Sequence, residues 1–180
     1  MKKYADDYEI VITEDANGKE KKSAVYRGDY YEVQFDESQL LRFKRINLLL
    51  LLIVVLFHVA AGFVANPGMY QFYVSVPYVI VFLPLFFIAE GIIRLPNHKK
   101  PFRRDEIGLS FDRVKTSSHY LFYILAAVII GTLVFMIMSI PQVPIQEWVF
   151  LLLELGAAIS ALIILRMNNR VQVTLTVNRG

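Results

Sequence analysis

The sequence predicts an all-α membrane protein, a bundle of four transmembrane helices with a small cytoplasmic β-element. Hydrophobic residues make up 56% of the 180 residues and charged residues only 19%, and the charges are concentrated in three stretches that long charge-poor runs separate. An apolar run of about 18 residues or more is long enough to cross the hydrocarbon core of a bilayer. The Lys and Arg residues flank these runs on one side only, which is the pattern that fixes orientation in membranes.

Residues 1–36 predict a cytoplasmic β-hairpin or meander. The pair Asn17–Gly18 is a hairpin turn signal, because both residues tolerate a positive φ. Three stretches have the composition of strands: Tyr8–Thr13, Lys22–Tyr26 and Tyr30–Phe35.

Residues 167–180 form a cytoplasmic C-terminal segment. Apolar and polar residues alternate from Val171 to Val177, which is typical of a strand with one apolar face. Two or three short strands alone are marginally stable in water. We therefore expect this strand to pair with the N-terminal ones, and a frayed tail is the alternative.

Residues 37–166 form the predicted transmembrane domain, and residues 36–38 supply the cap of its first helix. The expected spans are 46–65, 70–95, 119–140 and 147–165, and a cytoplasmic loop covers 96–118. Pro77 and Pro84 should bend the second span, because a proline removes a helical hydrogen bond. Within the loop, Asp105–Lys115 has the apolar periodicity of a short helix.

The distribution of basic residues predicts the orientation. All 19 Lys and Arg residues lie before residue 46, between 94 and 118, or after residue 165, and the two remaining loops hold none. The positive-inside rule therefore places both termini and the 96–118 loop in the cytoplasm of a multi-pass protein of the cell (inner) membrane.

His58 and Glu154 are the ionisable residues deepest within the spans. At 1.5 Å per residue, His58 lies about 19 Å from Arg45 and Glu154 about 18 Å from Arg166. Because the first and fourth spans are antiparallel, the two side chains should reach a similar depth and form an intramembrane polar pair. A proton-linked or ligand-binding site is the functional interpretation, and an interhelical polar clamp is the structural one.

Other charged residues are less specific indications of function. Glu90 and Arg94 are one turn apart and predict an ion pair at a helix end. Six basic residues of the 94–118 region are candidates for contacts with anionic lipid headgroups, although control of topology explains the same charges: Lys99, Lys100, Arg103, Arg104, Arg113 and Lys115.

No catalytic, metal-binding or phosphate-binding motif is present in the sequence. There are no cysteines, which excludes disulfides and thiolate sites. We therefore expect no enzyme activity, no metal, no cofactor and no nucleic-acid partner.

Three stretches resemble small four-span bacterial membrane proteins of unknown function: Tyr26–Tyr31 (YRGDYY), Asn66–Gly68 with Tyr73–Tyr78 (NPG and YVSVPY), and Ser110–Lys115 (SFDRVK). The resemblance implies the four-span topology and assigns no site residue.

These features favour a non-enzymatic accessory, assembly or scaffold component of a membrane complex. Its partners would be the lipid bilayer and either another membrane protein or a second copy of the chain. The alternative is a subunit of a small oligomeric transporter or channel that uses His58 and Glu154.

Overall fold

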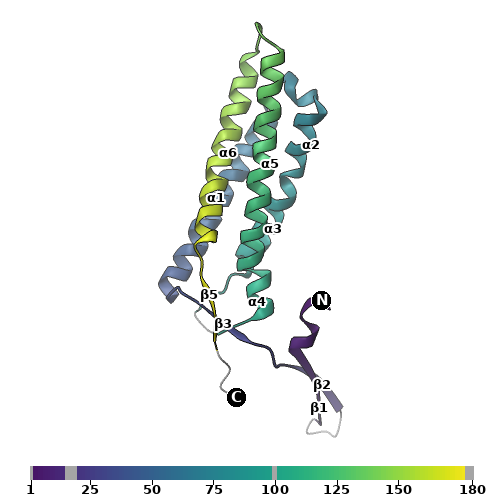
Figure 1. Ribbon diagram of the computed structural model, residues 1–180, viewed down its shortest axis with the longest axis vertical. Coiled ribbons are helices and arrows are strands. Elements are labelled where there is room, and N and C mark those ends of the chain that lie inside the picture. The colour runs from purple at the N-terminus through teal and green to yellow at the C-terminus, as the bar shows by residue number, and fades with distance from the viewer. Residues whose placement is uncertain (1, 15–19, 99–100, 177–180) are drawn as a thin grey trace.

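The computed structural model describes residues 2–14, 20–98 and 101–176. Four long apolar helical segments run side by side, and two small sheets lie at one end of them (Figure 1). Each segment is long and apolar enough to cross a membrane, so the chain is a multi-pass membrane protein with a four-helix bundle. We call the end with the sheets and both termini the sheet end, and the other the loop end.

The four helical segments connect the two ends alternately. They are α1 (Glu37–Gly62), α2 and α3 together (Phe72–Ile80 and Phe82–Arg94), α5 (Phe111–Met138) and α6 (Ile145–Asn169). Helix α1 packs against α6 and α3, and α5 packs against α6, α2 and α3, so neighbouring helices are antiparallel. A 3₁₀ turn, η2 (Pro67–Tyr70), joins α1 to α2 at the loop end.

Local sequence explains where these helices begin and break. The Asp36 side chain caps α1 by accepting from the Gln39 backbone N–H at 2.7 Å, and the Gln39 side chain accepts from the Asp36 N–H in return. The second span is divided at Val81, between Pro77 and Pro84, as two prolines seven residues apart predict. The short helix expected over 105–115 is divided in the structure: α4 (Arg104–Leu109) ends at Leu109, Ser110 caps it, and residues 111–115 belong to α5.

The prediction that the C-terminal strand joins an N-terminal one is confirmed. Strand β5 (Val173–Thr176) pairs antiparallel with β3 (Tyr30–Val33), and Val33 lies opposite Val173. The other edge of β3 pairs with β4 (Phe102–Arg103), so the order is β4-β3-β5.

Of the two interpretations of residues 1–36, the hairpin is confirmed and the continuous meander is wrong. Strands β1 (Tyr8–Glu14) and β2 (Glu20–Tyr26) form a separate hairpin, and β3 does not continue it. The Tyr26 phenol donates to the Asp29 backbone carbonyl at 2.7 Å, which fixes the chain reversal after β2 and directs β3 beneath the bundle. The predicted turn at Asn17–Gly18 lies outside the described residues. A further 3₁₀ turn, η1 (Lys2–Asp7), precedes β1.

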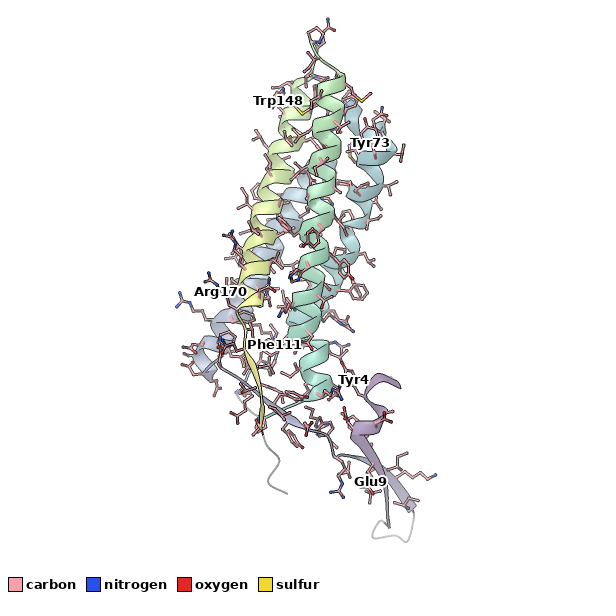
Figure 2. All side chains as sticks on the ribbon, viewed as in Figure 1. Tyr4, Glu9, Tyr73, Phe111, Trp148 and Arg170 are labelled. Atoms are coloured by element: carbon pink, nitrogen blue, oxygen red, sulfur yellow. The ribbon has the colours of Figure 1, made fainter. Side chains whose placement is uncertain are left out.

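Aromatic side chains mark the two ends of the bundle. Trp148 and Tyr73 lie toward the loop end, and Glu9 lies on the hairpin beyond the sheet end (Figure 2). Tyr120 and Tyr123 are exposed on α5 toward the sheet end. Such aromatic residues favour the two interfaces of a bilayer, so their spacing agrees with helices that cross it.

Candidate functional site

The interior of the bundle contains an ionisable pair, nearer the loop end than the sheet end. His58 of α1 and Glu154 of α6 are both fully buried, and His58 Nδ1 lies 2.9 Å from Glu154 Oε1. The antiparallel packing of α1 and α6 brings the two side chains to the same depth. The helical rise of 1.5 Å per residue predicts a similar depth for these two residues, and the structure brings them into contact.

Tyr78 of α2 completes this cluster with two contacts to His58. The Tyr78 phenol donates to the backbone carbonyl of His58 at 2.8 Å, and the His58 Nε2 atom lies 3.1 Å from the backbone carbonyl of Tyr78. This carbonyl lies at the break between α2 and α3, where it accepts a long 3₁₀-type bond of 3.3 Å from the Val81 N–H, which also donates to the Pro77 carbonyl at 3.1 Å. The proline-induced break in the second span thus provides an acceptor for the histidine.

Counting hydrogen-bond donors and acceptors gives the number of protons that His58 and Glu154 hold together. A backbone carbonyl only accepts, so the Nε2 atom of His58 must carry a hydrogen. The short contact between Nδ1 and Glu154 Oε1 then needs one further proton, held as imidazolium with carboxylate or as neutral imidazole with carboxylic acid. Both forms are neutral overall, which is the condition for burial in an apolar bundle. Glu154 Oε2 has no hydrogen-bond partner among the described residues.

Two further groups of buried hydrogen bonds join α6 to α1 or to the turn that follows α1. At the sheet end, the Asn168 side-chain amide donates to Asn47 Oδ1 at 2.8 Å. At the loop end, Glu147 accepts from the Gly68 backbone N–H at 2.6 Å and from the Asn66 amide at 3.3 Å.

These contacts and the His58–Glu154 pair together form what we call the polar seam: Asn47, His58, Asn66, Glu147, Glu154 and Asn168. All six side chains are buried. The seam favours one register of α6 against the first span, because sliding one helix by a turn would break all of these contacts between them.

Glu90 and Arg94 form the helix-end ion pair, with Arg94 Nη2 lying 2.7 Å from Glu90 Oε1. Arg113 of α5 reaches the other carboxylate oxygen, and its guanidinium lies 5.8 Å from the centre of the Phe87 ring. The carboxylate therefore ties α3 to α5 at the sheet end.

The six candidate lipid-contact residues occupy different surroundings. Lys99 and Lys100 lie outside the described residues, and Arg113 is bound to Glu90. The Arg103 guanidinium lies 5.5 Å from the centre of the Tyr26 ring, and Arg104 Nη1 lies 3.9 Å from Asp7 Oδ1. Lys115 has no ion-pair partner within the described ranges. Among the described members of this set, Lys115 alone has neither an ion pair nor an aromatic contact.

Two phenols anchor the hairpin at the sheet end. The Tyr8 phenol donates to Asp105 Oδ2 at 2.9 Å, and the Tyr26 oxygen accepts from the Arg104 backbone N–H at 3.0 Å. Burial raises the pKa of Tyr8 and also the pKa of Tyr26. Both phenols therefore remain neutral, hydrogen-bonding groups at ordinary pH.

Sequence reasoning did not identify Tyr78, Arg113 as the partner of Glu90, or the two outer contacts of the seam. A polar residue at each end of an apolar run was the available signal for Asn47, Asn168 and Glu147. No three His, Asp or Glu side chains converge as a metal site anywhere in the described part of the chain.

Comparisons with protein-family models, curated proteins and solved structures found no match. The resemblance to four-span bacterial membrane proteins therefore stays a prediction.

Proposed function

We propose that the chain is a non-enzymatic accessory or scaffold component of a membrane assembly. It would lie in the inner membrane with both termini in the cytoplasm, as the one-sided basic residues favour. The hairpin of β1 and β2 would be the part that meets the partner. The observation that carries this proposal is the exposed apolar face of that hairpin.

The hairpin extends beyond the sheet end, away from the helices (Figure 1). Ile10 and Ile12 alternate on one face of β1, and their exposed fractions are 71% and 55%. The opposing Ala24 of β2 is exposed on the same face. Lipid covers exposed apolar side chains on the helices, but it does not reach a hairpin that lies beyond them. An apolar face there is typical of a protein-binding surface.

The unpaired edges of β1 and β2 also support a protein-binding role for the hairpin. The described residues include no third strand beside β1 or β2, so both strands have an open edge. An isolated two-stranded hairpin is marginally stable in water, and an added strand from a partner would stabilise it. The base of the hairpin is held by Tyr8 and Tyr26, which leaves its far end available.

Co-purification from mild detergent tests this proposal. We expect the wild-type chain to emerge with a defined partner, and the double variant Ile10→Ser/Ile12→Ser to lose it. Val25→Ser is the matched control, because it removes a less exposed apolar side chain from the opposite face of the hairpin. A wild-type chain that always emerges alone and monodisperse would contradict the proposal.

The second candidate is a subunit of an oligomeric transporter or channel, and the His58–Glu154 pair favours it. That pair shares one proton in the buried interior of the bundle, and one oxygen of Glu154 is unpartnered within the described ranges. Such a group is a reasonable proton-binding element. Proteoliposome flux that is unchanged in Glu154→Gln and His58→Ala would reject this candidate.

A further inference from the structure

A half-open cavity of about 210 Å³ lies at the sheet end, where α6 passes into β5 beside the start of α5. Figure 2 labels Phe111 and Arg170 in this region. The cavity is lined by three polar or charged residues and three apolar ones: Asp112, Lys115, Asn168, Phe111, Val171 and Val173.

Asn168 contributes to this cavity an acceptor oxygen for which the described residues supply no donor. Its side chain is only 3% exposed. The amide nitrogen already donates twice, at 2.8 Å to Asn47 Oδ1 and at 2.8 Å to the Ile164 backbone carbonyl. The Oδ1 atom has no hydrogen-bond partner among the described residues. An amide oxygen with free acceptor capacity beside a cavity is complementary to a ligand that donates N–H or O–H groups.

Asp112 and Lys115 add one charge of each sign. They are three residues apart on α5, which places their Cβ atoms about 5–6 Å from each other. Neither forms an ion pair with another described residue. The cavity therefore offers two acceptors, Asp112 and Asn168 Oδ1, and one ammonium donor. This arrangement is complementary to a zwitterion with a donating cation and an anion a few bonds apart.

We propose that this cavity binds a phosphoethanolamine group, and that the source is the headgroup of a phosphatidylethanolamine lipid. The ligand ammonium donates to Asp112 and Asn168 Oδ1, and its phosphate accepts from Lys115. Phe111, Val171 and Val173 contact the carbon atoms of the headgroup. This inference concerns a lipid site and is independent of the hairpin surface.

The depth of the cavity favours a lipid over a soluble compound. Lys115 precedes by one turn the apolar run of α5, and Asn168 lies in the last turn of α6. Both positions therefore lie where the apolar helices meet water, which is the level of phospholipid headgroups.

Headgroup chemistry predicts a clear order of preference. A primary ammonium has three N–H donors, whereas the trimethylammonium of phosphatidylcholine has none and cannot hydrogen-bond to Asn168 Oδ1. Phosphatidylglycerol has no cation, so its binding would leave Asp112 without a partner. The cavity should select phosphatidylethanolamine over both.

Native mass spectrometry of the full-length chain, released from nanodiscs of equal parts of the three lipids, tests the proposal. We expect retained phosphatidylethanolamine to exceed each of the other two. Asp112→Asn and Lys115→Gln should each reduce its retention about tenfold, because each removes one charge-assisted hydrogen bond. Arg42→Gln, at an exposed basic position of α1, is the control and should leave retention unchanged.

A charge-swapped variant separates a specific site from general electrostatics. Asp112→Lys with Lys115→Asp keeps the net charge but reverses the polarity beside Asn168, and retention should fall as in the single variants. Equal retention of all three lipids by the wild type, or an equal loss in Arg42→Gln, would overturn the proposal.

Titration with O-phosphoethanolamine in phosphatidylcholine nanodiscs identifies the source. Absence of binding there, with lipid retention intact, assigns the site to the membrane lipid. Binding of O-phosphoethanolamine without lipid selectivity would overturn the assignment to a lipid.

Discussion

The His58–Glu154 contact makes a quantitative prediction for the stability of the bundle. His58→Ala removes two interhelical hydrogen bonds, one to Glu154 Oε1 and one to the Tyr78 carbonyl. Such bonds contribute about 0.6–1.7 kcal/mol each in membranes. The variant also leaves a second oxygen of Glu154 unpaired, which costs about 1–3 kcal/mol more. We therefore expect the free energy of unfolding to fall by about 2–6 kcal/mol.

Glu154→Gln is the informative comparison for this prediction. A glutamine amide can donate to Nδ1 of a neutral His58 while Nε2 still donates to the Tyr78 carbonyl, so both hydrogen bonds of His58 are kept. We expect a loss below about 1 kcal/mol, the range of a conservative exchange that keeps its hydrogen bond. The double variant should lose no more than His58→Ala alone.

Reversible unfolding by SDS in mixed micelles, followed by helical circular dichroism, measures these differences. Leu56→Ala on the exposed side of α1 is the control for loss of apolar volume without loss of packing. A loss below about 0.5 kcal/mol in His58→Ala, within the usual error of additivity, would refute the clamp. An equally large loss in Glu154→Gln would refute the inferred proton arrangement.

Two further substitutions test the packing and the sheet end. A Cβ at Gly131 would lie 2.9 Å from the Tyr73 backbone carbonyl, so Gly131→Ala should destabilise the bundle by about 1–3 kcal/mol in the same assay. Ile130→Ala, at the exposed neighbouring position, should have almost no effect. The raised pKa of Tyr26 means that its contribution is complete below the ordinary value of 10.0 and is lost as the pH rises through the folded-state value. Melting temperatures should therefore fall more steeply in the wild type than in Tyr26→Phe as the pH rises from 10.0 to the folded-state value; parallel curves would contradict this.

The helices and the level of the central pair were predictable because both depend on length and rise alone. Apolar runs longer than the bilayer core define spans, and 1.5 Å per residue places His58 and Glu154 at one depth. The C-terminal strand was predictable because its two-residue period differs from that of a helix. Local composition fixes each of these features before any tertiary contact forms.

The remaining contacts depend on how each helix is rotated about its axis and on where strand β4 lies. Nothing in the order of residues indicates that Arg113 reaches Glu90, or that the broken helix offers the Tyr78 carbonyl to His58. Strand β4 has only two residues and forms solely because β3 presents an open edge. For the same reason the hairpin was wrongly extended into β3, since strand composition does not specify which strands pair.

Site-directed labelling tests most directly the claim that four helices cross a membrane and return both chain ends to one face. The chain has no cysteine, so single cysteines at Ser23, Gln142 and Asn169 each give an unambiguous signal. We expect a membrane-impermeant maleimide to label position 142 in intact cells and positions 23 and 169 only after lysis. Labelling of positions 23 and 169 from opposite sides would contradict the four-span bundle.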